Sequence, residues 1–339
     1  MATFRAFRVE KRVEKRVEKT GDRRFPRRVI EQDTADLPSG DLLIEVDYSS
    51  LNYKDALSAT GNPGVTRYFP HTPGIDAAGT VVESSSDGFA PGDAVIASGY
   101  DLGMNTPGGF GQRIRIPAGW AIPMPAGLDA RTSMILGTAG FTAALSVRKL
   151  EEAGMRPEGG PVLVTGATGG VGAVAVKLLA RLGYEVHAVT GKPSQHGFLR
   201  GLGAREVVSR EDAGKGAERP LLKPVWGGVI DTVGGPILFN AVKALRYGAS
   251  AAACGLVASP EIPATVFPFI LRHVNLLGID SVELPLAQKA AIWERLAKPW
   301  RLDGLDELAV PLTLDTLSAA IDRILAGEMV GRGLVDLRG

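Results

Sequence analysis

Residues 165–172, with the sequence TGATGGVG, have the composition of a turn that binds a diphosphate. They lie between a short apolar run at 160–166 and an amphipathic helical pattern at 169–183. A diphosphate needs a tight turn, a backbone that no Cβ obstructs, and free N–H groups at the start of a helix. The three glycines of Thr168-Gly169-Gly170-Val171-Gly172 supply these features. The alternative is a glycine-rich turn between a strand and a helix that has no ligand.

The segment about 20 residues after this turn indicates whether the dinucleotide is NAD or NADP. An acidic residue there usually accepts hydrogen bonds from the adenosine ribose of NAD. Residues 187–196, HAVTGKPSQH, contain no Asp or Glu. Thr190, Gly191 and Lys192 would instead favour a 2′-phosphate, to which an ammonium donates a charge-assisted hydrogen bond. We therefore predict NADPH as the cofactor; the alternative for Lys192 is an ordinary surface lysine. Arg210, at the end of the next predicted strand, is expected to stack on the adenine or to add a second positive charge.

From about residue 134 the chain alternates between predicted strands and helices. The apolar runs are GPVLVTG, EVHAVTG, AREVVS, GGVIDTVG and GASAAACGL. Repeated strand–helix units predict an α/β fold with a doubly wound parallel sheet, the Rossmann type. Residues 25–133 instead hold short β-type runs broken by Gly and Pro, which predict a mostly antiparallel β domain. Residues 300–339 return to short apolar runs, with one amphipathic helix near 315–326, and are expected to pack on that β domain.

The composition of the 339 residues excludes several classes of protein. A content of 45% hydrophobic and 22% charged residues is ordinary for a globular chain of about two domains. The 38 Lys and Arg nearly cancel the 37 Asp and Glu, so no net field favours nucleic acid or an anionic membrane. No run of 18 apolar residues and no signal-peptide core is present, so no membrane segment is predicted and a cytoplasmic location is expected.

The single cysteine and the four histidines do not predict a metal site. One cysteine excludes an internal disulfide and a thiolate-rich zinc site, and Cys254 is expected to be a buried, inert thiol. No two histidines have the spacing of metal ligands. A VEKR repeat at residues 9–20 predicts an extended, solvated hairpin at a sheet edge, with a binding arm as the alternative.

Nine stretches together resemble the quinone-oxidoreductase-like branch of the medium-chain dehydrogenase/reductase superfamily. They are SSLNYKDAL (49–57), PGIDAAGTV (73–81), GTAGFTA (137–143), VTGATGGVG (164–172), VTGKPS (189–194), IDTVGG (230–235), ACGL (253–256), PFILR (268–272) and GIDSV (278–282). The resemblance covers nearly the whole chain from residue 38 onward. Within the branch, the sequence is most similar to the NADPH-dependent acrylyl-CoA reductases. One departure is Thr106-Pro107, where close relatives tend to carry His-Trp in a loop on the substrate side.

The resemblance implies a fold, a reaction and an assembly. It implies a GroES-like catalytic β domain formed by residues 1–133 and 300–339, and a Rossmann NADPH-binding domain at 134–299. The reaction is hydride transfer from NADPH to the activated C=C of acrylyl-CoA, which gives propanoyl-CoA, and the family implies a homodimer. One alternative is an NADPH-dependent reductase of quinones or other enones. An alternative of another class is a non-catalytic NADPH-binding structural module.

The resemblance also assigns the site residues. Gly74-Ile75-Asp76 stands where zinc-binding members carry Gly-His-Glu, and no cysteine lies near Asn52, so the reaction is expected to use no metal. Tyr53 is the candidate to hold the nicotinamide or ribose and to donate a proton, with Asn52 orienting it; the alternative is that Tyr53 only packs, as buried tyrosines often do. Asp55 is expected to be a structural acid at a helix start. The implied cofactor contacts are Tyr53, Thr168, Gly169, Gly170, Val171, Thr190, Gly191, Lys192, Arg210, Leu256, Ile270 and Ser281.

Overall fold

The structure is a computed structural model that describes residues 3–12 and 24–339. Contacts between Cα atoms divide the chain into two units. Unit 1 comprises Met1–Thr138, Val282–Ala297 and Gly304–Gly339, and unit 2 comprises Ala139–Ser281 and Lys298–Asp303. Each unit has its own sheet and is described by itself.

Unit 2 contains a six-stranded parallel sheet. Its strands are β8 (Val162–Val164), β9 (Val186–Thr190), β10 (Glu206–Ser209), β11 (Trp226–Asp231), β12 (Leu245–Ala253) and β13 (Asn275–Gly278). The order across the sheet is β10-β9-β8-β11-β12-β13, and every neighbouring pair is parallel. In chain order this is 3-2-1-4-5-6, the order of a dinucleotide-binding Rossmann sheet. The predicted doubly wound α/β fold is therefore confirmed.

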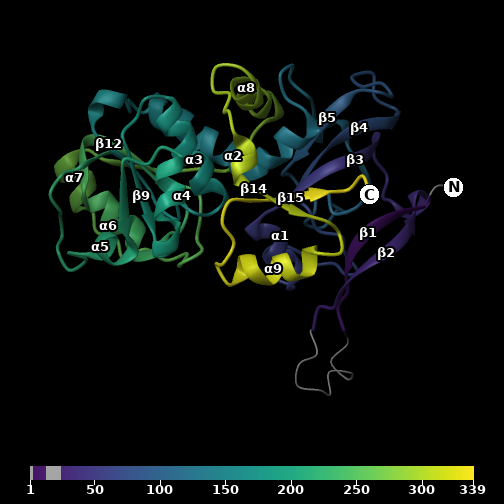
Figure 1. Cartoon of the computed structure of the whole chain (residues 1–339), viewed down its shortest axis with the longest axis horizontal. Helices are drawn as coiled ribbons and strands as arrows, with labels where there is room; N and C mark the ends of the chain where they lie inside the picture. The colour runs from purple at the N-terminus through teal and green to yellow at the C-terminus, as the bar shows by residue number, and fades with distance from the viewer. Residues whose placement is uncertain (1–2, 13–23) are drawn as a thin grey trace. The chain divides into compact units, whose positions relative to one another are not determined.

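Helices between these strands cover the sheet (Figure 1). They are α3 (Gly170–Arg181), α4 (His196–Gly201), α5 (Arg210–Gly214), α6 (Gly235–Lys243) and α7 (Phe267–Arg272). Leu238, Phe239 and Val242 of α6 pack on apolar side chains of the central strands. The alternation of apolar strands and amphipathic helices arises because each helix must bury its apolar stripe on the sheet.

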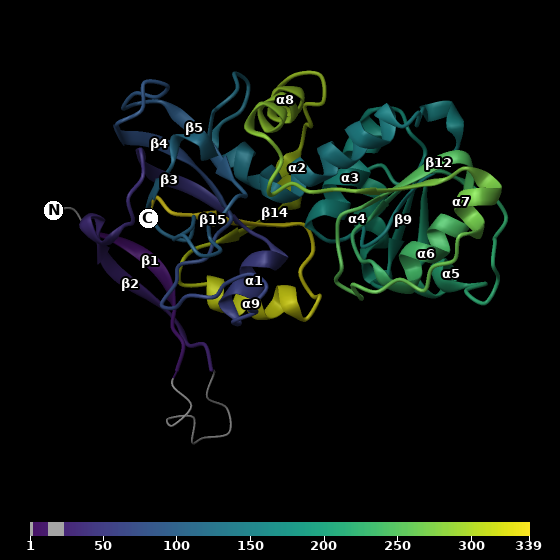
Figure 2. The same cartoon turned by 180° about the vertical axis from the view of Figure 1, so that it is seen from behind.

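Unit 1 is built on a seven-stranded sheet, mostly antiparallel. Its strands are β3 (Leu42–Leu51), β4 (Asp76–Ser84), β5 (Ala94–Ser98), β6 (Arg113–Ile116), β7 (Ala121–Pro123), β14 (Ala309–Leu312) and β15 (Arg332–Asp336). The order is β14-β15-β3-β4-β5-β7, with β6 also paired to β3, and only β14 and β15 run parallel. Helices α1 (Tyr53–Ala59) and α9 (Leu317–Leu325) lie side by side in both views (Figures 1 and 2).

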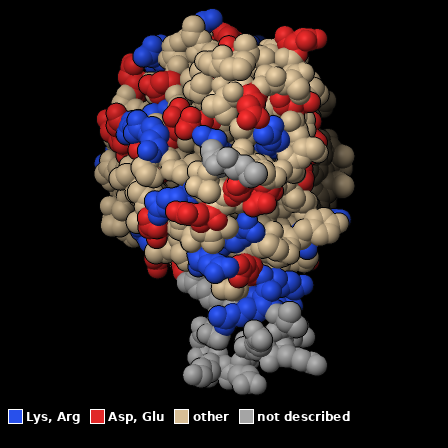
Figure 3. Space-filling model, turned by 90° about the vertical axis from the view of Figure 1, so that its right-hand side faces the viewer, with Lys and Arg blue, Asp and Glu red and all other residues tan. Residues whose placement is uncertain are grey.

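The N-terminal strands form a separate two-stranded sheet in unit 1. β1 (Thr3–Val9) pairs antiparallel with β2 (Arg27–Asp33), and the N–H of Arg12 still donates to the carbonyl of Arg24 at 3.0 Å. Figure 3 shows basic and acidic side chains mixed over the face that carries this sheet, with basic ones gathered beside the grey residues.

The VEKR repeat is described only in part, because its residues 13–20 lie outside the described residues. The prediction of a solvated hairpin is wrong for Val9. This side chain is buried in the core of unit 1, and its backbone exchanges two hydrogen bonds with His71, both 2.8 Å. An apolar side chain is stabilised by such burial, whatever the charge of its neighbours in the sequence.

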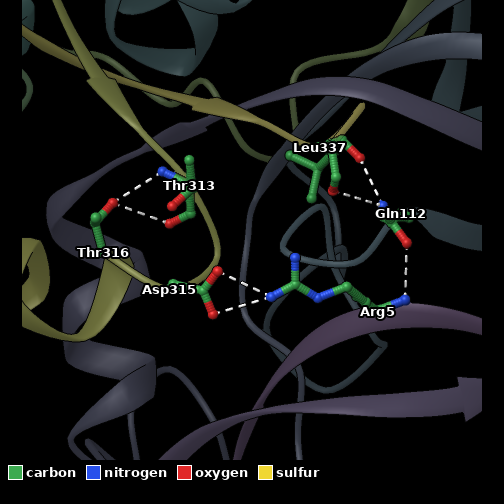
Figure 4. A network of polar contacts seen from close by, with 7 residues as sticks. Arg5, Gln112, Thr313, Asp315, Thr316 and Leu337 are labelled. Atoms are coloured by element: carbon green, nitrogen blue, oxygen red, sulfur yellow. Dashed lines mark hydrogen bonds and ion pairs between the residues drawn. The ribbon is translucent and has the colours of Figure 1, made fainter.

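The C-terminal segment is attached to the start of the chain by a polar network (Figure 4). Arg5 donates to both carboxylate oxygens of Asp315 at 2.9 Å, and its backbone N–H donates to Gln112 Oε1 at 2.8 Å. Gln112 Nε2 in turn donates to the carbonyl of Leu337 at 2.9 Å. These contacts help to place residues 304–339 in unit 1.

The positions of two helices differ from the domain boundaries predicted from the sequence. α2 (Ala130–Glu152) is interrupted at Gly137, whose φ of 51° and ψ of −159° are not helical, so the predicted domain boundary at residue 134 falls within this helix. α8 (Leu286–Ala297) belongs to unit 1, although the sequence analysis placed it in the dinucleotide-binding domain. Within residues 3–12 and 24–339, none of the helices combines the length and the apolar content needed to cross a lipid bilayer.

Candidate cofactor site and active site

The glycine turn after β8 has a geometry that only glycine permits at two positions. Gly166 has a φ of 58°, in the left-handed region, and its carbonyl accepts a hydrogen bond from the N–H of Gly169 at 2.9 Å. A Cβ on Gly172 would lie 2.4 Å from the carbonyl oxygen of Gly166. The turn leads directly into α3, which begins at Gly170 and is 12 residues long. The open backbone and the helix N-terminus together fit a diphosphate.

Most residues predicted to contact a cofactor lie along the carboxyl edge of the unit 2 sheet, which is the edge formed by the ends of its strands. All six strands are parallel, so their carboxyl ends meet at the same edge. The strand order reverses between β8 and β11, which is where open α/β sheets bind ligands. The residues at this edge are Thr168, Gly169, Gly170 and Val171 after β8, Thr190, Gly191 and Lys192 at the end of β9, Arg210 after β10, Leu256 after β12 and Ser281 after β13.

The end of β9 carries a hydroxyl and lies against a guanidinium. The exposed side chain of Arg210 packs on Gly191 so closely that a Cβ at residue 191 would lie 2.8 Å from Nη2. The Thr190 hydroxyl accepts a hydrogen bond from the backbone N–H of Lys192 at 3.1 Å. The guanidinium of Arg210 therefore lies at the strand end where the sequence lacks an acidic residue, which suits a phosphate better than a ribose hydroxyl.

A buried carboxylate joins the ends of the two central strands. Asp231, the last residue of β11, accepts hydrogen bonds from Thr165 Oγ1 at 2.6 Å and from the N–H of Gly234 at 2.7 Å. Burial raises the pKa of Asp231, and these hydrogen bonds oppose the increase. Because Thr165 begins the glycine turn, Asp231 fixes that turn relative to β11 at the point where the strand order reverses.

Cys254 follows β12 and has the environment of an unreactive thiol. Its Sγ lies 3.1 Å from the carbonyl oxygen of Asp231. Burial raises the pKa of Cys254 to about 12, and the charge of Asp231 adds to the increase. A thiol with so high a pKa is not a nucleophile at neutral pH.

Tyr53 and Asn52 belong to unit 1, at the junction of β3 and α1. Asp55 accepts hydrogen bonds from the N–H groups of Asn52 and Ile75, both at 2.8 Å, and so fixes the first turn of α1. Burial raises the pKa of Asp55 to about 7, and the charge of Asp76 adds to the increase. Tyr53 is half-buried, and among residues 3–12 and 24–339 its hydroxyl has no hydrogen-bond partner. This hydroxyl is therefore available to a ligand.

The side chain of Asn52 is directed into unit 1. Its Nδ2 donates to Asp76 Oδ2 at 2.7 Å, and its Oδ1 accepts a hydrogen bond from Arg332 Nη1 at 3.2 Å. Asp76 is fully buried and also accepts hydrogen bonds from Thr138 Oγ1 at 2.6 Å and from the Ser50 hydroxyl. Because both polar atoms of its side-chain amide are hydrogen-bonded, Asn52 is suited to orienting its neighbour Tyr53. A direct catalytic role for Asn52 stays a prediction.

Sequence reasoning did not assign Ser50 or Thr138 to any site. Each is the second residue of a quoted motif, SSLNYKDAL and GTAGFTA, so the available signal was a hydroxyl inside each motif. Arg332, a third such residue, lies in none of the motifs quoted above. It is fully buried, and its Nε donates to the carbonyl of Ile135 at 2.9 Å.

Ile270 is the predicted contact that does not follow a strand end. It lies in α7 and is 70% exposed. Leu256, which does follow a strand end, is also exposed. Both side chains would be stabilised by a partner that covers them.

The residues at the positions of a zinc site do not fit zinc. Ile75 has no ligand atom in its side chain, and Asp76 already accepts hydrogen bonds from Asn52 and Thr138. In the part of the chain that the structure describes, no group of three or more His, Cys, Asp or Glu has a geometry that could hold a metal ion.

Two family models match the chain: the alcohol dehydrogenase GroES-like domain over residues 38–126 and the zinc-binding dehydrogenase over residues 170–297. The chain belongs to the medium-chain dehydrogenase/reductase family of oxidoreductases. An acrylyl-CoA reductase of Ruegeria pomeroyi is 47% identical over 89% of this chain and 92% of its own length. A putative quinone oxidoreductase of Bacillus subtilis is 46% identical over 90% of this chain and 92% of its own length.

Two solved structures are similar over almost the whole chain. A Salmonella enterica oxidoreductase in complex with NADP has 43% sequence identity and a TM-score of 0.93, and the match covers 98% of this chain and 100% of that chain. A Bacillus subtilis protein with NAD bound has 43% identity and a TM-score of 0.93, and covers 99% and 100%. The predicted combination of a GroES-like β domain with a Rossmann domain is confirmed.

Proposed function

We propose that the protein is an NADPH-dependent reductase that converts acrylyl-CoA to propanoyl-CoA by hydride transfer without a metal. The observation that carries this proposal is the end of β9, where the guanidinium of Arg210 packs on Gly191 and no acidic residue is present. The relative from Ruegeria pomeroyi, named an acrylyl-CoA reductase, supports the choice of substrate. The name of the Bacillus subtilis relative makes a quinone or another enone the second candidate substrate.

The unit 2 residues at the carboxyl edge would hold NADPH. The N–H groups that start α3 would bind the diphosphate, and Thr190, Lys192 and Arg210 would bind the 2′-phosphate. The Salmonella enterica relative solved with NADP supports this choice, although the Bacillus subtilis structure contains NAD. We also assign Tyr53, Leu256, Ile270 and Ser281 to the cofactor by their positions in the family motifs.

The remaining chemistry falls to side chains of the protein. When bound, NADPH supplies the hydride for the β-carbon of the enoyl thioester. Negative charge then develops on the thioester oxygen, and a proton is needed at the α-carbon. Tyr53 is the proposed donor, because its hydroxyl has no partner within residues 3–12 and 24–339 and its backbone is fixed by Asn52 and Asp55.

An assay with three acceptor conditions tests the proposal. Purified protein is mixed with NADPH and with acrylyl-CoA, with a benzoquinone, or with no acceptor, and the absorbance of NADPH is followed. We expect turnover with acrylyl-CoA. Turnover with the benzoquinone alone would establish the second candidate. Absence of turnover with either acceptor, in a protein that still binds NADPH, would favour a non-catalytic binding module.

We further propose that the protein is a cytoplasmic homodimer. Among the described residues, strand β13 is at the edge of its sheet and pairs only with β12, and nearby Tyr247, Val266 and Leu271 are exposed apolar side chains. An open edge flanked by apolar surface suits a second copy of the chain. Light scattering should give twice the mass of the chain, and Leu271→Glu should reduce it to one copy. Tyr68→Glu, at an exposed tyrosine of unit 1, should leave the mass unchanged.

A further inference from the structure

A buried polar cluster connects four segments of unit 1 that are far apart in the sequence. We call Ser50, Asn52, Asp76, Thr138 and Arg332 the Asp76 cluster. The carboxylate of Asp76 accepts hydrogen bonds from Asn52 Nδ2, from the Thr138 N–H at 2.9 Å and hydroxyl at 2.6 Å, and from the hydroxyl of Ser50. A fully buried carboxylate with this many donors is strongly fixed, because each bond to a charged acceptor is stronger than a neutral one.

The interruption of α2 at Gly137 depends on the same cluster. A Cβ on Gly137 would lie 2.3 Å from Ser50 Oγ and 2.7 Å from both Asp76 Oδ2 and Arg332 Nη2. Its φ of 51° also favours glycine. The backbone therefore approaches the carboxylate closely, and the next residue, Thr138, donates two hydrogen bonds to it. Thr138 is the last residue of this part of unit 1, and the chain enters unit 2 at Ala139.

Arg332 binds the opposite side of Asn52. Its Nη1 donates to Asn52 Oδ1, and its Nε donates to the carbonyl of Ile135, two residues before Gly137. Its Nη2 is buried and has no hydrogen-bond partner in the described part of the chain. The guanidinium thus also contacts both the start of α1 and the interruption of α2, and it supplies positive charge beside Asp76 and Asp55.

We propose that Asp76 is a positioning residue that fixes the start of α1, with Tyr53, and the Gly137–Thr138 segment in one arrangement, and that this arrangement sets the geometry of hydride transfer. The inference rests on the proposed function. Asp76 connects the residue that is proposed to contact the substrate with the segment that leads into the cofactor-binding unit. A small displacement of either reacting group lowers the rate of transfer steeply.

Asp76→Asn tests this role, because the amide has nearly the same size but offers only one acceptor oxygen to the surrounding donors. We expect kcat with acrylyl-CoA to fall on the order of 10- to 100-fold. The Kd for NADPH should stay within about threefold, since the phosphate-binding residues belong to unit 2 and each tenfold change needs about 1.4 kcal/mol. The kinetic isotope effect with NADPH deuterated at the transferred position should rise, because hydride transfer becomes slower than the other steps.

A second pair of variants keeps the proposal testable if Asp76→Asn does not fold. Thr138→Ser retains the hydroxyl donor and should keep the kcat and isotope effect of the unmodified protein. Thr138→Val keeps the shape but removes the donor, and should lower kcat and raise the isotope effect. Asp93→Asn is the matched control, since Asp93 is an exposed carboxylate of unit 1 that accepts one backbone hydrogen bond, from Ala90.

The possible results separate the two hypotheses. If the unmodified protein reduces acrylyl-CoA and both Asp76→Asn and Thr138→Val keep its kcat and isotope effect, the positioning role is overturned and the proposed function stands. If Thr138→Ser is as slow as Thr138→Val, the hydroxyl contact is not the cause and the role is also overturned. If the unmodified protein reduces neither acrylyl-CoA nor a quinone, both the proposed function and the inference fail.

Discussion

The ammonium of Lys289 lies 3.5 Å from the centre of the Tyr100 ring. The same Nζ donates hydrogen bonds to the carbonyls of Ser98 and Val282, both at 2.8 Å, and the side chain is only 1% exposed. Tyr100 has a left-handed backbone, with a φ of 51°, and its hydroxyl donates to the carbonyl of Leu284. Lys289 therefore attaches α8 and the segment before it to the end of β5 and to the loop that follows.

Replacement of this lysine should destabilise unit 1. Lys289→Met keeps the length of the side chain but removes one hydrogen bond each from the carbonyls of Ser98 and Val282, and it removes the cation from the ring. The Val282 carbonyl keeps the N–H of Tyr100 as a donor at 3.1 Å. We expect the free energy of unfolding to fall by about 1–3 kcal/mol for the two lost hydrogen bonds and the lost cation–π contact. Urea denaturation measures the change, and Lys223→Met, at an exposed lysine, is the matched control. Equal stability of the two variants would show that the buried contacts of Lys289 contribute nothing.

The contact between Gly191 and Arg210 gives a prediction for cofactor choice. A Cβ at residue 191 would lie 2.8 Å from Arg210 Nη2, and because this end of the exposed side chain is flexible, the guanidinium should move away. Gly191→Ala should therefore lower the affinity for NADPH roughly 10-fold or more, which corresponds to the loss of one charge-assisted hydrogen bond. NADH binding and thermal stability should be almost unchanged. Titration calorimetry with both cofactors measures this. Gly197→Ala, where a Cβ meets no atom within 4 Å, should change neither affinity.

Charge reversal at Lys192 tests a second residue at the same end of β9. Lys192→Glu places a carboxylate where the 2′-phosphate is proposed to bind, so NADPH should lose at least about 10-fold in affinity while NADH is nearly unaffected. Lys223→Glu makes the same change of charge just before β11, at the opposite edge of the parallel sheet. Equal losses for NADPH and NADH in the Lys192 variant would show that this residue does not contact the phosphate.

The parts of the fold that could be predicted from the sequence are those with local signals. The apolar runs, the helix periodicity and the glycine turn each lie within a few consecutive residues, and parallel strands necessarily bring their carboxyl ends to one edge. Thr190 and Arg210 are therefore found at the same edge, as the pattern implied. The assignment of these residues to a cofactor stays a prediction.

The parts that could not be predicted depend on contacts between distant segments. Asp76 and Arg332 belong to one cluster, but no periodicity relates β4 to β15. α8 has the helical pattern of its sequence neighbours, and its place in unit 1 depends on tertiary contacts such as those of Lys289. Val9 was assigned to a solvated repeat because its neighbours are charged, whereas pairing with His71 decides its burial.

The stability of unit 1 should depend on pH through His71. The ring is 4% exposed, its Nε2 lies 2.9 Å from the carbonyl oxygen of Gly103, and burial lowers the pKa of His71 from 6.5 to about 4. The folded state therefore disfavours the protonated ring. The contribution is fully present above pH 6.5 and is lost as the pH falls toward 4, by about 3 kcal/mol in total.

His71→Gln isolates this effect, because glutamine retains an N–H donor at a similar position and does not titrate. Between pH 7 and pH 4 the free energy of unfolding should fall by about 3 kcal/mol more in the unmodified protein than in the variant. Asp55 acts in the opposite direction, since its pKa of about 7 lies above the unfolded value and its contribution to stability increases as the pH falls from 7 to 4. Both proteins contain Asp55, so its effect cancels in the comparison. Parallel pH profiles from urea denaturation would contradict a buried, neutral His71.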